Sequence, residues 1–376
     1  MNIPLIIIFL LTLFYFTFLM KIYAGLGKLK FSENIFPYNF NYVSVIIPFR
    51  NEEKNIELNI KSIQKQRFDE NKFEVIYVND NSDDNSVSIL KEKIKNKNIR
   101  ILNISNSGAL TGHKKRAINY GINNSRGDII VTTDADCTYT PEWLTTLVSC
   151  FEKDTGFVSG PVEFISGSGF WNKIQRLEFA GLIITGAGLI GANKPVICNA
   201  ANLAFRKDAF LKVNGYKDNL NISSGDDEFL MQKIHKLTGY KIKFCASKRA
   251  KVYTNAADSL TEFYNQRKRW ASKGIFYFDK LLVVKLVLIY LFYLCLFVQP
   301  VLGFFNPVFF VTFAVSFLIK FITEYLIIRK GNKLLYDYKF TGDFFIAEIL
   351  HVPYILLAGF AGLFGNYNWK NRKVKR

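Results

Sequence analysis

The stretch Asp128-Ile-Ile-Val-Thr-Thr-Asp-Ala-Asp136 joins a hydrophobic run to a pair of carboxylates, and it decides how the chain is expected to fold. The β-branched run before Asp134 is typical of a strand that is covered on both faces. Three similar runs precede it, at Val43–Pro48, Phe73–Val78 and Ile99–Ile104. Apolar residues recur at helical spacing between these runs. The alternation predicts an α/β domain over residues 40–280, with a mostly parallel sheet between layers of helices.

Polar side chains follow three of the predicted strands. Pro48 and Glu52 come at the end of the first strand, Asp80 after the second, and Asp134 with Asp136 after the fourth. Ligands of such sheets bind beyond the carboxyl ends of the strands, so we expect these residues to meet at one edge. Carboxylates in an Asp-x-Asp pattern suit Mg²⁺, which commonly binds one or two carboxylates together with substrate phosphates.

Three further motifs have both a structural and a functional interpretation. Lys114 opens a predicted helix, where it either meets phosphates or is simply solvated. Asp226 and Asp227 precede another helix, where a carboxylate either caps the helix or acts as a general base toward a hydroxyl. Gln266-Arg-Lys-Arg-Trp270 is either a basic segment beside the membrane or a clamp in which Arg binds phosphate and Trp stacks on a sugar.

Long apolar segments flank the domain. Residues 1–22 contain an apolar run of spanning length, which predicts a retained N-terminal anchor. Residues 281–328 are too long for one helix and are expected to form two spans that turn near Pro307. Residues 344–365 either cross the membrane or form a re-entrant or interfacial segment, because Pro353 and three glycines interrupt them. A basic tail, 366–376, would lie outside the cell if that segment crossed completely.

The net charge of +18 has a simple source, because much of the lysine and arginine flanks these apolar segments. The positive-inside rule then predicts an integral protein of the cell (inner) membrane whose domain at 40–280 lies in the cytosol. A nucleic acid is not expected as a partner. The five cysteines form no C-x-x-C pattern and are expected to be reduced thiols.

Taken in order, the motifs resemble those of the membrane-bound, family-two inverting glycosyltransferases, the group that contains cellulose, hyaluronan and poly-N-acetylglucosamine synthases and ceramide glucosyltransferase. Asn79 and Asn199 depart from the usual residues of two of these motifs. The segments that carry the resemblance are Val45–Pro48 with Asn51-Glu52, Val78–Asp84, Lys114–Asn119, Asp134–Asp136, Asn199–Arg206, Asp226-Asp227 and Gln266–Trp270.

The resemblance implies a GT-A nucleotide-diphospho-sugar transferase domain and a role for each matching position. Asp80, with Pro48, Glu52 and Lys114, would bind the donor, a nucleotide sugar linked to UDP. Asp134 and Asp136 would hold Mg²⁺ or Mn²⁺ on the diphosphate. Asp227 would be the catalytic base, with Asp226 beside it. The residues that would contact the acceptor or the diphosphate are Asn202, Gln266, Arg269 and Trp270.

The acceptor remains open at this point. A small number of spans favours a lipid or lipid-linked acceptor, whereas an exopolysaccharide synthase subunit, working with a partner subunit, is the main alternative. A glycine-rich stretch after Trp171 and Phe179 is a candidate for an amphipathic segment near the acceptor entrance. A non-catalytic scaffold is disfavoured because both carboxylate motifs are present. A transporter would need polar residues within the spans, and Lys320 with Glu324 is the suggestive pair.

Overall fold

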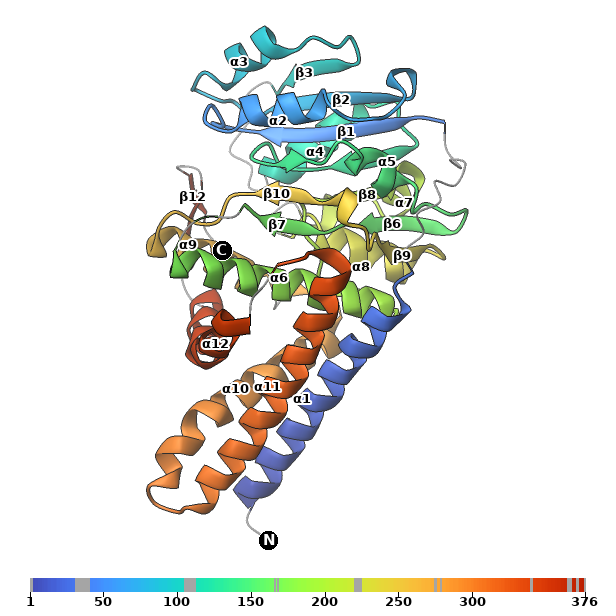
Figure 1. Cartoon of the computed structure of the whole chain (residues 1–376). Helices are drawn as coiled ribbons and strands as arrows, with labels where there is room; N and C mark the ends of the chain where they lie inside the picture. Colours follow the sequence, from blue (N-terminus) through green and yellow to red (C-terminus); the bar gives the residue numbers. More distant parts are fainter. Residues whose placement is uncertain are drawn as a thin grey trace.

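A computed structural model of the chain describes residues 3–30, 41–104, 113–165, 167, 169–219, 225–273, 276–277, 279–338, 341–363, 367–369 and 372–374. Its upper half is an α/β domain and its lower half is helical (Figure 1). One hydrophobic core runs through both halves, from the strands to residues such as Tyr15 and Leu296 of the long helices.

A seven-stranded mixed sheet forms the centre of the α/β domain, in the order β3-β2-β1-β4-β8-β6-β9. The first four strands are parallel, and β8 runs antiparallel to both β4 and β6. Every residue of β1, β2 and β4 is buried, as their hydrophobic runs predict. The strands are β1 Val43–Phe49, β2 Phe73–Asn79, β3 Ile99–Asn103, β4 Ile129–Thr132, β6 Thr155–Ser159, β8 Leu203–Arg206 and β9 Lys241–Phe244.

A smaller sheet and short helices complete the domain. The order of the small sheet is β5-β10-β7, formed by Thr138–Tyr139, Val252–Thr254 and Val162–Phe164. Helix α4 packs on β1 and β2, which brings its first turn to the carboxyl ends of these strands. The helices of the domain are α2 Ile56–Ile63, α3 Ser86–Lys93, α4 His113–Asn123, α5 Trp143–Val148, α7 Lys207–Lys212, α8 Glu228–Leu237 and α9 Leu260–Ala271.

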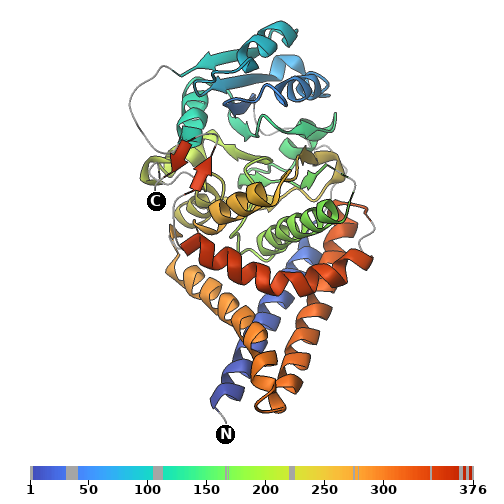
Figure 2. The ribbon, with the colours of Figure 1, turned by 90° about the vertical axis from the view of Figure 1, so that its left-hand side faces the viewer.

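Within the described residues, five helices are long and apolar enough to cross a membrane. Helices α1, α10 and α11 lie side by side and project away from the sheet, whereas α6 and α12 run across them beneath the domain (Figures 1 and 2). The two crosswise helices therefore differ in direction from the bundle, although their composition is similar. The five are α1 Ile3–Lys28, α6 Phe170–Gly191, α10 Lys280–Gly303, α11 Val308–Leu335 and α12 Thr341–Leu363.

Helices α1 and α6 approach each other unusually closely. A Cβ atom added at Gly25 would lie 1.9 Å from the carbonyl oxygen of Gly188, and one added at Gly191 would lie 2.3 Å from that of Gly25. Small residues allow such backbone contact between apolar helices. The glycines of α6 thus serve to fix it against α1, beside the cavity described below.

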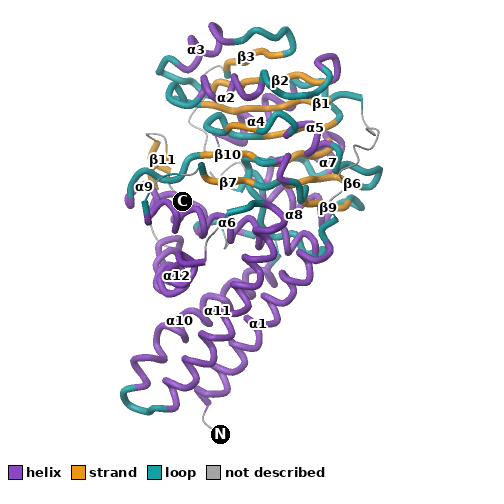
Figure 3. Tube along the Cα trace, viewed as in Figure 1, coloured by secondary structure: helices purple, strands orange, loops and turns teal. Residues whose placement is uncertain are grey.

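The C-terminal end of the chain returns to the α/β domain. Two short strands, β11 Tyr367–Trp369 and β12 Arg372–Val374, pair with each other, and β11 contacts α9. Figure 3 shows this hairpin above α12, on the side of the bundle that carries the sheet. The crosswise direction of α12 agrees with the position of β11 and β12 on the same side of the bundle as the domain.

Candidate active site

Lys114 connects two carboxylate motifs that are far apart in the sequence. Its Nζ lies 2.6 Å from Oδ1 of Asp134 and 3.3 Å from Oδ2 of Asp226. Burial disfavours the charge of Lys114, but these carboxylates hold its pKa well above the ordinary value. The pKa of Asp226 is lowered in turn, because Lys114 and Lys115 outweigh the effect of its burial. The Asp-x-Asp motif and the Asp226-Asp227 pair therefore belong to one site.

The same helix turn reaches Asp80. Arg116 Nη2 lies 3.7 Å from Asp80 Oδ1, and His113 Nδ1 lies 3.9 Å from Asp80 Oδ2. Arg50, which follows β1, donates hydrogen bonds to the backbone carbonyls of Asp80 and Asn81 at 2.9 and 2.7 Å. The loops after β1 and β2 are thereby fixed to each other and to α4.

Pro48 and Glu52 lie at this edge but are more buried than a surface loop would be. Pro48 is inside β1, opposite Val78 of β2. Glu52 is 8% exposed, and its side chain accepts a hydrogen bond from Asn55 Nδ2 at 2.9 Å. Both residues therefore belong to the structured end of β1.

Asp134 and Asp136 lie on the same side of the chain where β4 ends. Ala135 between them is buried, whereas both carboxylates are half-buried. Thr254 Oγ1 lies 3.5 Å from Asp136 Oδ2, so one carboxylate contacts β10 and the other contacts Lys114. Two hard oxygen donors that share a side and border a cation-rich helix end fit Mg²⁺ or Mn²⁺ with a diphosphate.

Asp227 is both a helix cap and a candidate base. Its Oδ1 accepts the backbone N–H of Glu228 at 2.7 Å and lies 3.7 Å from Lys273 Nζ. No hydrogen bond of its Oδ2 is found within the part of the chain that the structure describes. The two interpretations are thus compatible, since one carboxylate oxygen is used by the cap and the other remains for a proton.

Sequence reasoning missed a second ionic group next to this base. Lys273 Nζ lies 3.0 Å from Glu228 Oε1, and Tyr277 donates a hydrogen bond to Glu228 Oε2. Burial raises the pKa of Glu228 to about 7, despite the opposing effect of Lys273. Burial also lowers the pKa of Lys115 to about 8. The position of Lys273, three residues after Trp270, is the signal in the sequence that could have found it.

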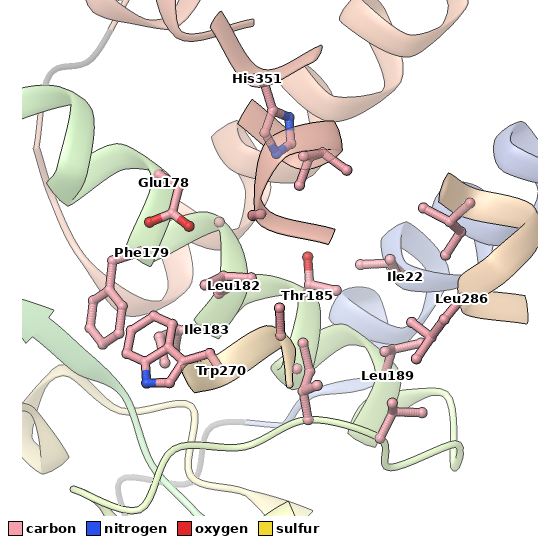
Figure 4. A pocket seen from close by; sticks show the side chains of 18 of the residues that line it. Ile22, Glu178, Phe179, Leu182, Ile183, Thr185, Leu189, Trp270, Leu286 and His351 are labelled. Atoms are coloured by element: carbon pink, nitrogen blue, oxygen red, sulfur yellow. The ribbon is translucent and has the colours of Figure 1, made fainter. Parts of the chain in front are cut away.

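A large cavity of about 1320 Å³ begins at Asp227 and extends among the long helices. Its wall is formed by residues of α1, α6, α8, α9, α10, α11 and α12, and most of them are apolar or aromatic. Figure 4 shows Trp270, Phe179 and Glu178 at one end of this cavity and Ile22, Leu189 and Leu286 at the other. A carboxylate of the polar site therefore opens directly onto an apolar chamber.

Within the Gln266–Trp270 segment, the residues that line the cavity are not all those for which a contact is predicted. Trp270 lines it, and so does Arg267, which pairs with Glu178 and stacks at 4.3 Å on the Trp270 ring. Gln266 accepts a hydrogen bond from Arg267, whereas neither Gln266 nor Arg269 lines the cavity. The segment lies on α9 and holds α6 against the cavity.

Asn202, for which an acceptor contact is predicted, has its side chain inside the domain. This side chain is fully buried, accepts a hydrogen bond from Trp143 Nε1 at 2.9 Å, and donates to the carbonyls of Pro161 and Ala250 at 2.8 Å each. All of its amide groups are used inside the domain. Asn202 therefore joins α5 to the segments that precede β7 and β10.

A polar cluster in the wall of the cavity links the helices. Lys320 is completely buried and pairs with Glu324 of the same helix and with Glu348 of α12. Glu324 also accepts a hydrogen bond from the hydroxyl of Tyr15 in α1. Glu324, Glu348 and His351 could geometrically hold a metal ion. Lys320 already pairs with both carboxylates, so the cluster is better described as a connection among α1, α11 and α12.

Two family profiles match the chain. The profile described as "Glycosyl transferase family 2" covers residues 44–213, and "Glycosyl transferase family group 2" covers residues 129–361, more than half of the chain. These ranges include every carboxylate motif from Asp80 to Asp227 as well as the Gln266–Trp270 segment.

Curated relatives include poly-beta-1,6-N-acetyl-D-glucosamine synthases. The one from Staphylococcus epidermidis is 28% identical over 238 residues, which are 62% of this chain and 54% of the relative. The one from Staphylococcus aureus strain COL is 26% identical over 264 residues, 69% of this chain and 60% of the relative. The matches thus span little more than half of the length of these relatives.

Among solved structures, the chain is similar to a mannosyltransferase from Pyrobaculum calidifontis in complex with GDP-Man and Mn²⁺. The TM-score is 0.58 at 18% identity, and the similarity covers 95% of this chain and 98% of that chain. At this identity the likeness concerns the fold, and it extends to the helical half as well as the sheet.

Proposed function

The chain belongs to the glycosyl transferase family group 2, and from that premise we propose that it transfers a sugar from a nucleotide donor to a hydroxyl of a membrane lipid or lipid-linked acceptor, with inversion at the anomeric carbon. One observation carries the proposal: Asp227 lies where the polar site, organised by Lys114, opens onto the apolar cavity. A polar donor and a lipid acceptor can therefore reach the same carboxylate from opposite sides.

The donor half is suited to a nucleotide diphosphate, which we take to be UDP. Asp80 offers its carboxylate to the uridine, between Pro48 and Glu52 on one side and α4 on the other. Lys114 and the first turn of α4 present positive charge to the diphosphate.

Asp134 and Asp136 would hold Mg²⁺ or Mn²⁺ in this site. A bound divalent ion would offset the charge that develops on the departing diphosphate. The mannosyltransferase of similar fold is in complex with Mn²⁺, which supports this assignment.

Asp227 acts as the general base through Oδ2. It takes the proton of the acceptor hydroxyl while that oxygen attacks the anomeric carbon from the face opposite the diphosphate. Lys273 and the N–H of Glu228 hold Oδ1, which fixes the direction of the carboxylate. Trp270 and Arg267 form the wall against which the acceptor is positioned.

We place the protein in the cell (inner) membrane, with α1, α10 and α11 spanning it and the catalytic domain in the cytosol. Helices α6 and α12 would lie at the cytosolic interface. This arrangement puts the basic residues at the start of α10 and the C-terminal tail on the cytosolic side, in agreement with the positive-inside rule.

An exopolysaccharide synthase subunit is the second candidate. The names of the curated relatives favour it, and such a synthase would act with a partner subunit. The cavity favours the lipid acceptor, because its wall is apolar over most of its extent.

The experiment measures which product carries the label of a labelled sugar donor. The full chain, reconstituted in vesicles of bacterial lipid with a labelled UDP-sugar and Mn²⁺, is expected to place label in an organic-soluble glycolipid. Asp136→Ala, Asp227→Asn or a chelator should abolish this product. Label that accumulates in a long water-soluble or insoluble polymer would favour the second candidate, and full turnover in both variants would disprove the assigned chemistry.

A further inference from the structure

Basic side chains gather at one end of the cavity. Lys21 of α1, Lys194 in the loop after α6 and Lys285 of α10 all line it. Lys21 and Lys194 are exposed and Lys285 is half-buried, so these residues mark a place where the cavity opens to the surroundings. Within the described residues, none of the three forms an ion pair with a carboxylate.

Neighbouring contacts place these lysines around a single opening. Ile22, next to Lys21, packs on Gly188 of α6, and Lys194 follows the end of the same helix. Lys236 of α8 also lines the cavity and pairs at 3.0 Å with Asp279, the residue that caps α10. In Figure 4, Ile22, Leu189 and Leu286, the last adjacent to Lys285, lie together at the end away from Trp270.

The surroundings of His235 reflect an excess of positive charge at this opening. It lines the cavity, and burial, Lys194 and Lys236 all lower its pKa. Asp279 is the carboxylate at this end, and it is already paired with Lys236. The opening thus has more cations than anions, while the wall just inside it is apolar, with Phe18, Leu189 and Ile289.

Attraction of any anionic lipid to lysines beside the membrane is the simpler explanation of such a cluster. It does not account for Lys236, which belongs to α8 of the α/β domain. Lys28 and Lys280, in contrast, belong to α1 and α10 and do not line the cavity. Only some of the lysines on these helices therefore line the cavity, and those that do lie at its opening.

We propose that the acceptor is a phosphate-bearing lipid, held at this opening by Lys21, Lys194 and Lys285, with its hydrocarbon chain along the apolar wall and its hydroxyl-bearing group directed to Asp227. The inference rests on the proposed glycosyl transfer and names the class of acceptor. The phosphate is not consumed. The hydroxyl oxygen bonds to the anomeric carbon, the bond from that carbon to the diphosphate of the donor breaks, and the proton passes to Asp227.

Binding without turnover tests the proposal. The full chain, in nanodiscs of neutral phosphatidylcholine without nucleotide sugar, is titrated with a polyprenyl phosphate and with the polyprenol of the same length. Each lysine near an anionic group is expected to contribute about fivefold in affinity. The wild-type protein should therefore prefer the phosphate by roughly 100-fold, and the triple variant Lys21→Ala, Lys194→Ala, Lys285→Ala should lose that preference.

A matched control is the pair Lys28→Ala, Lys280→Ala, which removes cations from the same helices and should keep the preference. Unchanged binding of the polyprenol shows that the triple variant is folded. Equal affinity of the wild-type protein for the two probes would overturn the proposal. So would retention of the preference in the triple variant, or equal displacement of the probe by phosphatidylglycerol or inorganic phosphate.

These outcomes are separate from those for the proposed function. If the phosphate preference depends on the three lysines but no sugar is transferred, the lipid site stands and glycosyl transfer fails. If sugar is transferred to a lipid without any such preference, only the assignment of the phosphate-bearing acceptor fails.

Discussion

The donor half and the acceptor half of the site are built in opposite ways. The donor half consists of short polar segments at the ends of β1, β2 and β4, held together by ion pairs of one helix turn. The acceptor half is an apolar cavity to which seven helices contribute, from Phe14 to Gly359. Under the proposed function, ion pairs would organise the donor half, an apolar wall would receive the hydrocarbon part of the acceptor, and Asp227 would belong to both halves.

The largest effect is expected where the halves meet. Asp227→Asn keeps the size and the cap but cannot accept a proton, so kcat should fall by about 10² to 10⁴-fold. Donor affinity, measured by calorimetry, should stay within about twofold, because the donor half is intact. A loss of donor binding equal to the loss of turnover would place Asp227 in the donor half alone. Asp208→Asn, on the surface, is the control.

Removing the cation of the donor half should affect the donor and not the acceptor. Lys114→Gln leaves Asp134 and Asp226 without their shared partner, and the loss of a charge-assisted contact to phosphate should weaken nucleotide binding by about 10 to 100-fold. Binding of the lipid acceptor should be unchanged. Lys54→Gln, an exposed residue after β1, should bind the nucleotide normally. Normal binding by the Lys114 variant would show that charge does not position the donor.

Glu228 provides a pH-dependent test at the boundary. Its pKa is about 7 in the folded protein and 4.5 ordinarily, so between these values only the folded state keeps the proton. Stability should therefore fall as the pH rises from about 4.5 to 7, by about 3 kcal/mol at most.

Glu228→Gln cannot ionise and should lack this decline. The thermal midpoints of the two proteins in detergent, compared at pH 5 and pH 7, measure the difference. Parallel midpoints across this range would show that Glu228 is ionised throughout, next to Lys273.

The smallest effect is expected from filling the cavity. Leu286→Trp adds volume at its wall and should raise the KM for the lipid acceptor by about tenfold, with the rate of donor hydrolysis unchanged. Leu291→Trp, on the same helix and similarly exposed, does not line the cavity and should behave as wild type. Equal effects of both substitutions would indicate that shape at this wall does not select the acceptor.

Local patterns located the strands and the motifs at their ends, but not the cavity. Strand periodicity located β1, β2 and β4, and each motif brings its carboxylate to the sheet edge by a few residues of chain. The cavity could not be foreseen in this way, because its wall comes from segments hundreds of residues apart. Asn202 shows the same limit: its motif resembles an acceptor segment, yet only tertiary packing reveals that Trp143, Pro161 and Ala250 use its amide.

The orientation of each apolar helix could not be predicted from its own composition. Helices α1 and α12 are both long and apolar, yet one belongs to the bundle and the other lies across it (Figure 2). The buried pair of Lys320 with Glu348 helps to fix α12 in that position. Composition gives the length of an apolar helix, whereas partners such as these decide how it is oriented.

A structure of the Asp227→Asn variant in lipid, with Mn²⁺, a non-hydrolysable UDP-sugar and the co-purified acceptor, tests the central claim most directly. The account predicts the sugar at the edge formed by β1, β2 and β4, a lipid in the cavity, and the acceptor oxygen about 3 to 3.5 Å from the anomeric carbon beside residue 227. A nucleotide bound away from Asp134 and Asp136, or a cavity that stays empty while the acceptor reaches the donor from the solvent side, would contradict it.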